Sequence, residues 1–242
     1  MIKNCLVLCL VFFSGYMVSQ NIERRQSVEK ATIEYLLISG SQSAIYYGKQ
    51  PEGHQPSENH PYLVDSIYAK AIISYRGVLY PEEMLLLDWN RNELLIKSPD
   101  NKDIVLFPES VDFAALHGFH IIYMLNDGKP GCPPTGYFIQ LHSGNCRVLK
   151  RQTARLGTLE SMSSYGTSSY TIDYIKSTQF YIYKDEAYYI IRNKRELLNR
   201  LHPHKKELKK YISNNHWQFK KDAEELITKT VIEYEKLSGG LQ

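Results

Sequence analysis

One pattern dominates residues 31–191: short apolar runs separated by turn-forming residues. Arg76-Gly77 separates the runs 71–75 and 78–80, and a Gly at such a turn accepts a positive φ without steric cost. Comparable turn sequences lie at 88–92, 142–145 and 184–186. Because strands joined by such short connections pair as antiparallel neighbours, the pattern predicts roughly ten antiparallel strands.

Beyond residue 191 the apolar period changes from that of a strand to that of a helix. Asn193 and Glu196 have the spacing of a capping box ahead of a leucine-rich stretch. Two further amphipathic stretches follow at 204–214 and 220–237. We therefore predict an α+β fold, in which an antiparallel β meander forms a sandwich or a partly open barrel and is followed by two or three C-terminal amphipathic helices.

The stretch 156–170 interrupts the apolar runs. It is rich in Ser, Gly and Thr and poor in apolar residues. This composition is typical of a surface connection. We expect a mobile surface loop there.

The first residues have the features of an export signal. Lys3 provides a positive charge ahead of the apolar run Cys5–Phe13, and small residues follow at Ser14, Gly15 and Ser19. The run is much shorter than the roughly 20 apolar residues that cross a bilayer. We expect cleavage between Ser19 and Gln20.

This signal sets the expected organisation of the chain. Residues 1–19 form the signal peptide, 20–191 the β domain and 192–242 a basic helical region. The mature protein is expected to be exported, to be periplasmic, outer-membrane-associated or secreted, and to have no transmembrane span. Nucleic acid is not an expected partner of an exported protein.

Charge is unevenly distributed along the chain. The whole chain has a net charge of only +3, yet residues 192–221 contain many Lys and Arg and only Glu196 and Glu207 as acids. Within this region one set of lysines recurs at helical spacing, opposite Leu208 and Ile212: Lys205, Lys206, Lys209 and Lys210. Such a surface can meet anionic lipid, acidic glycan or an acidic protein face. The alternative is a solvated helix face over an ordinary core stripe.

Two cysteines remain after the signal is removed, because Cys5 and Cys9 lie within it. Cys132 and Cys146 can form one disulfide in an oxidising compartment. Two independent thiols are the alternative.

Histidines provide the candidates for metal or acid–base chemistry. His117 and His120 form a close pair, which could share a metal only if Gly118 bends the strand. His54 and His60 lie in a polar loop that also carries glutamates, and histidine titrates near neutral pH. Ordinary hydrogen-bonded or solvated histidines are the alternative in both places.

Several short motifs are spread over most of the mature chain. They are His60-Pro61-Tyr62, Tyr75-Arg76-Gly77 with Tyr80, Met84-Leu85-Leu86, Tyr188-Tyr189-Ile190 with Lys194-Arg195, and Lys205-Lys206-Glu207-Leu208 with Phe219-Lys220-Lys221. In these motifs the chain resembles a group of uncharacterised exported β-rich proteins of Bacteroidota. The resemblance implies no activity, ligand or catalytic residue.

No G-x-S-x-G or HExxH motif is present in the sequence. The leading hypothesis is a non-enzymatic envelope module, without a cofactor, that docks on an envelope protein, a glycan or an anionic lipid surface. One alternative is a hydrolase or metal-dependent enzyme that uses the His54/His60 loop or His117/His120. The other is a soluble carrier of a small ligand. Oligomeric state and closure of the sheet stay open at this stage.

Overall fold

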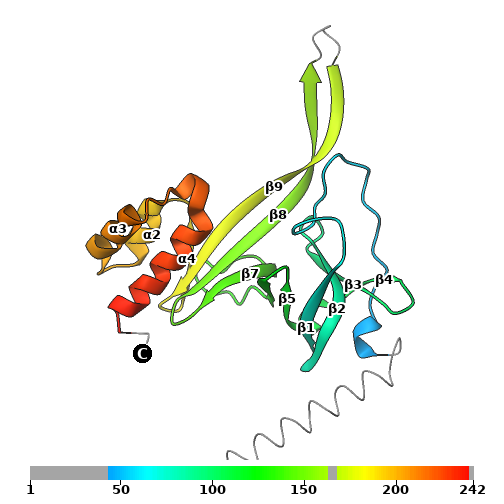
Figure 1. Cartoon of the computed structure of the whole chain (residues 1–242), viewed down its shortest axis with the longest axis horizontal. Helices are drawn as coiled ribbons and strands as arrows, with labels where there is room; N and C mark the ends of the chain where they lie inside the picture. The colour runs from blue at the N-terminus through cyan, green and yellow to red at the C-terminus, as the bar shows by residue number, and fades with distance from the viewer. Residues whose placement is uncertain (1–42, 163–167, 240–242) are drawn as a thin grey trace, which may run out of the picture. The chain divides into compact units, whose positions relative to one another are not determined.

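The computed structural model describes residues 43–162 and 168–239. The chain divides into two compact units, residues 1–47 and 48–242. The described part of the first unit is residues 43–47, with the short 3-10 helix η2 (Ala44–Tyr46). The second unit contains both the sheet and the C-terminal helices (Figure 1). The expected signal peptide lies outside the described residues.

Ten strands and three α-helices are described in the second unit. The strands are β1 (Ala69–Tyr75), β2 (Val78–Asp88), β3 (Glu93–Lys97), β4 (Asp103–Val105), β5 (Val111–Leu116), β6 (Phe119–Met124), β7 (Gly136–Ser143), β8 (Arg147–Met162), β9 (Ser168–Lys184) and β10 (Ala187–Ile191). The helices are α2 (Lys194–Arg200), α3 (Lys205–Asn214) and α4 (Phe219–Leu237). A 3-10 turn, η3 (Pro108–Ser110), precedes β5.

All ten described strands belong to one antiparallel sheet in the order β10-β9-β8-β7-β6-β5-β1-β2-β3-β4. The predicted α+β class is confirmed, and the sheet is not closed into a barrel. Neighbours in the sequence are neighbours in the sheet with one exception. After β4 the chain returns to the other side of β1 and continues as β5, so two meanders are joined through the β1–β5 pair.

The first hairpin forms at Arg76-Gly77 as predicted, with Tyr75 paired with Val78. Both turn residues have positive φ, 53° and 74°, which explains the Gly at the second position. The apolar runs 78–80 and 84–87 are parts of the single strand β2 rather than two strands. Pro81 is tolerated inside it because the register with β1 shifts beside this position, where no ladder bond is required.

The expected surface loop at 156–170 is wrong over most of its length. β8 and β9 continue as a paired ladder up to Met162 and Ser168. Thr and Tyr favour extended backbone, and a main-chain ladder does not require apolar side chains. Residues 163–167 lie outside the described part of the chain.

The helices cover one face of the strands β8 to β10. Val148 and Ile182 on that face pack in one cluster with leucines and isoleucines of all three helices. The next residue along β8, Leu149, packs in a different cluster with Phe138 and Tyr188. Since neighbouring residues of a strand point to opposite faces, these clusters lie on the two sides of the sheet.

The three helices lie within two residues of their expected positions. The backbone N–H of Glu196 donates to the Asn193 side chain at 2.9 Å, as predicted for the cap. The Glu196 carboxylate accepts the N–H of Arg192 at 2.8 Å, one residue earlier than in a standard capping box. Among the described residues no helix is both long and apolar enough to cross a membrane.

Candidate functional site

The basic surface of α3 has the geometry expected from the sequence. Its four lysines, Lys205, Lys206, Lys209 and Lys210, are exposed, whereas Leu208 and Ile212 on the other side are fully buried in the cluster that α3 shares with α2 and α4. Lys205 donates to the amide oxygen of Asn199 at 2.7 Å. None of the four forms an ion pair with a described acidic residue. The charges of α3 therefore face solvent uncompensated.

The neighbouring helices also carry exposed basic residues. Lys220 and Lys221 at the start of α4 are exposed, and so is Arg195 of α2. Between residues 192 and 221 the only basic residue in a described ion pair is Arg192, which lies 3.9 Å from Glu196. The helical region consequently presents a largely unpaired positive charge.

His54 belongs to a partly buried chain of hydrogen bonds that the sequence did not reveal. Its Nε2 lies 2.5 Å from a carboxylate oxygen of Asp88, at the end of β2, and its Nδ1 lies 2.8 Å from the Tyr174 hydroxyl of β9. Asp88 and Tyr174 are 2% and 4% exposed. The other Asp88 oxygen accepts the N–H groups of Asn90 and Arg91 in the β2–β3 turn.

A Tyr–His–Asp chain can in principle relay a proton. Burial, reinforced by the Asp88 charge, raises the pKa of Tyr174, so the phenol stays protonated near neutral pH. The hydrogen bonds anchor the loop 51–61 to β2 and β9.

Two further contacts fix the same loop. Arg91 donates to the Glu52 carboxylate and to the carbonyl oxygen of Gly53, each at 2.9 Å. The Asn59 amide accepts the N–H of Tyr174 at 2.7 Å and donates to the Tyr174 carbonyl at 3.0 Å. The loop is thus held to the edge of β9.

The two histidine pairs are not assembled into metal sites. His60 stacks on Tyr62, and His54 meets the same ring edge-on, with centroids 5.9 and 5.8 Å away. Burial and the Lys176 charge lower the pKa of His60. His117 lies in the β5–β6 turn, and His120 stacks on Phe113. Within the described part of the chain no three His, Cys, Asp or Glu residues are grouped to hold a metal ion.

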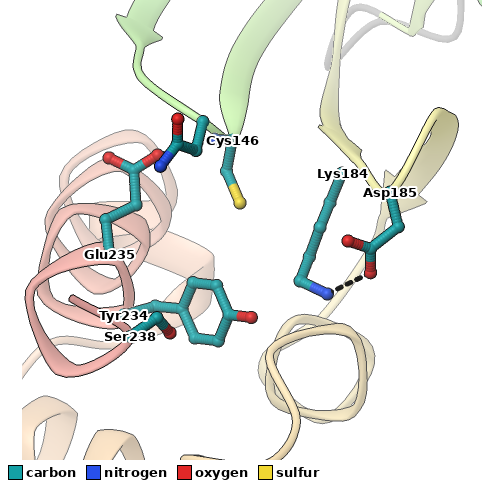
Figure 2. Close-up of a pocket in the computed structure, with 7 residues that line it drawn as sticks. Cys146, Lys184, Asp185, Tyr234, Glu235 and Ser238 are labelled. Carbon is teal, nitrogen blue, oxygen red and sulfur yellow. Dashed lines mark hydrogen bonds and ion pairs between the residues drawn. The ribbon is translucent and has the colours of Figure 1, made fainter. Parts of the chain in front are cut away.

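A small cavity of about 150 Å³ lies between the end of α4 and the two adjacent hairpin turns (Figure 2). Its lining includes the Cys146 thiol, the Lys184–Asp185 ion pair and Tyr234. Burial alone would lower the pKa of Lys184, but Asp185 and the Tyr234 phenol raise it overall. Burial and the Glu235 charge raise the pKa of Cys146 to about 11. The thiol therefore stays protonated at neutral pH.

Glu235 of α4 is a buried carboxylate beside this cavity and is only 2% exposed. It accepts the Cys146 N–H at 2.6 Å, and its other oxygen lies 2.7 Å from Nε2 of His142. Gly144 stands against both side chains: a Cβ there would lie 2.3 Å from the Glu235 carboxylate and 2.6 Å from the His142 ring. The β7–β8 turn and α4 are joined through this contact.

The structure does not bring Cys132 and Cys146 together. Both are free thiols. Cys146 is part of the helix-covered cluster, whereas Cys132 packs against the cluster on the opposite face. The disulfide stays a prediction that a mass measurement before and after reduction would test.

Sequence reasoning missed Asp88, Tyr174 and Glu235. Asp88 precedes Trp89-Asn90 at a turn, which is a recognisable signal for a side chain that caps the turn. Its contact with His54, and that of Glu235 with His142, join residues 34 and 93 positions apart. One sequence carries no signal for such pairings.

Comparisons of the chain with protein-family models, with curated proteins and with solved structures find no match. The likeness to exported Bacteroidota proteins therefore remains a prediction from short motifs. A functional proposal for this chain is therefore based on its own contacts, burial and charges.

We expect Gly144→Ala to destabilise the protein by about 1–3 kcal/mol, because the added methyl group separates buried Glu235 from its partners. Urea unfolding measures this change. Gly53→Ala is the matched control, since a Cβ there has no neighbour within 4 Å, and its effect should stay within about 0.5 kcal/mol. Equal stability of the two variants would contradict the role assigned to the Glu235 contact.

We expect Asp88→Ala to lower the free energy of unfolding by about 2 kcal/mol or more, because it leaves the part-buried N–H groups of the turn and His54 without an acceptor. It should also make residues 51–61 sensitive to limited proteolysis. Asp112→Ala is the control, because Asp112 likewise accepts a turn N–H, that of Gly77, but is exposed. Unchanged resistance of the loop in Asp88→Ala would show that other contacts hold it.

Proposed function

We propose that the protein is an exported, non-enzymatic module that docks on an anionic component of the cell envelope through the basic surface of α3. One observation carries the proposal: the four exposed lysines of α3 have no described acidic partner, while the opposite side of the same helix is buried in the core. A helix fixed in this way presents its charges in one direction.

The remaining basic residues support the same interpretation. Lys220, Lys221 and Arg195 add to the positive surface, and the nearest acid on α3 is the single exposed Glu207. A lysine near an anionic lipid surface contributes about 1 kcal/mol to binding. Four such lysines are sufficient for measurable docking at moderate salt, and the attraction decreases as salt screens the charges.

The test is sedimentation of the purified chain with vesicles of phosphatidylglycerol or of phosphatidylcholine, and with envelope fractions, at low and high salt. We expect capture by the anionic vesicles that is lost at high salt. Replacing Lys205, Lys206, Lys209 and Lys210 by Gln should weaken binding at least about 100-fold, from the contribution of about 1 kcal/mol per lysine.

The control carries the same change in net charge elsewhere. It replaces by Gln four exposed lysines outside α3: Lys49, Lys70, Lys102 and Lys229. The control should keep most of the binding. If both quadruple variants bind equally, the α3 surface is not the docking site. If the unmodified chain sediments with neither the vesicles nor the envelope fractions, docking itself is wrong.

A further inference from the structure

The face of the sheet opposite the helices carries a row of three arginines. On β8, Arg147, Arg151 and Arg155 occupy every fourth position. Leu149, between the first two, packs in the cluster on the side of the sheet away from the helices, and residues two apart along a strand share a face. The arginine row therefore lies on this face, at intervals of roughly 13 Å and over a length of roughly 27 Å.

Two of these arginines lie over aromatic rings. Cζ of Arg147 is 4.4 Å from the centre of the Tyr183 ring on β9, and Cζ of Arg151 is 5.7 Å from that of Phe138 on β7. Arg147 also donates to the Tyr188 hydroxyl at 3.4 Å. A guanidinium held over a ring keeps further N–H groups along its edge for an anion. The two cations are thus positioned before a ligand binds.

The charge of the arginine row is not compensated. Arg155 is exposed and the other two are partly exposed, and none of the three forms an ion pair with a described acidic residue. Asp127 is paired with Lys129 at 3.0 Å. Asp173, two residues beyond the partner of Arg155 on β9, accepts the N–H of Asn59 at 3.3 Å. The row is therefore a line of positive charge that ends beside an acid.

Neutral hydrogen-bonding groups lie between the arginines. On β9, Gln179 is the partner of Arg151 and Ser177 the partner of Thr153, and both β9 residues are exposed. The Gln179 amide oxygen accepts the Tyr181 hydroxyl at 2.9 Å, and the amide has two N–H donors in addition. The hydroxyls of Thr153 and Ser177 lie 2.8 Å apart. Cationic groups thus alternate with amide and hydroxyl groups along this face.

We propose that this face binds an extended acidic polysaccharide along the arginine row. Such a polymer carries carboxylates separated by hydroxyl-rich sugar rings, which matches guanidinium groups separated by amide and hydroxyl groups. Arginine pairs with a carboxylate through two parallel hydrogen bonds. An acidic peptide supplies the charges but not the hydroxyl groups. The row is separate from α3, so this inference does not rest on the docking proposed for that helix.

The test is calorimetric titration of the purified chain with galacturonate oligomers of increasing length at moderate salt. We expect the affinity to rise with length until the oligomer spans roughly 27 Å, the length of the row, and then to level off. Fully methyl-esterified polygalacturonate keeps the hydroxyl groups but loses the charges, and should not bind. Poly-glutamate of equal charge should bind at least about tenfold more weakly, the effect of losing one hydrogen bond to a charged group.

Replacing Arg147, Arg151 and Arg155 by Gln should raise the dissociation constant for the oligomer at least about tenfold. The matched control replaces Arg76, Arg195 and Arg200 by Gln. It makes the same change in net charge, and two of its arginines also lie over tyrosine rings, Arg76 over Tyr75 and Arg200 over Tyr189. The control should keep the binding, and circular dichroism should show the same fold in both variants.

Three results would overturn the proposal. They are no binding of the galacturonate oligomers, binding of the esterified polymer or of poly-glutamate as tight as that of the oligomers, and equal loss of binding in the two triple variants. The first two need no variant, so they decide even if a substitution disturbs folding. The four-lysine variant of α3 should keep oligomer binding, and the triple variant of the row should keep vesicle binding. Failure of one proposal is therefore distinguishable from failure of the other.

Discussion

The position of the helical region depends on one apolar cluster that joins α2, α3 and α4 to one face of β8, β9 and β10. α2 and α3 contain only seven and ten residues, fewer than the roughly 12–15 residues at which isolated helices become stable in water. Their stability must therefore come from packing. Each buried leucine or isoleucine contributes about 1.5–3 kcal/mol relative to an exposed one. The burial of Leu197, Leu208 and Ile212 therefore compensates for the low intrinsic stability of the two short helices.

The same cluster determines where the charges lie. With the apolar side of α3 buried, its lysines have only the solvent side available. The ion pair of Lys150 on β8 with Glu224 on α4, at 2.6 Å, and the buried Glu235 contact add fixed polar links between the sheet and α4. These two acids of α4 are thus used inside the unit, and none of the α3 lysines forms an ion pair with a described residue. The proposed docking surface and part of the core lie on opposite sides of one amphipathic helix.

The sequence was most informative where local patterns decide the structure. Gly77 in a tight turn, Asn193 at a helix start and the spacing of Leu208 and Ile212 all indicated the observed elements. It was least informative where distant residues decide: the return of β5 to β1, and the anchoring of His54 by Tyr174, join segments whose proximity leaves no local trace. The surface loop predicted for the Ser-rich stretch 156–170 was wrong for another reason. Its ladder is formed by main-chain bonds, which composition alone does not report.

Native-state hydrogen exchange tests most directly whether the helices and the sheet depend on one core. If they do, the slowest amides of α4, around Leu226–Val231, and those of β8, around Val148–Lys150, should open with the same free energy, that of global unfolding. A mutation in the cluster, such as Leu208→Ala, should lower both by the same amount. Opening of the helices at a much lower free energy than β8 would contradict the account, because the basic region would then be a separately unfolding appendage.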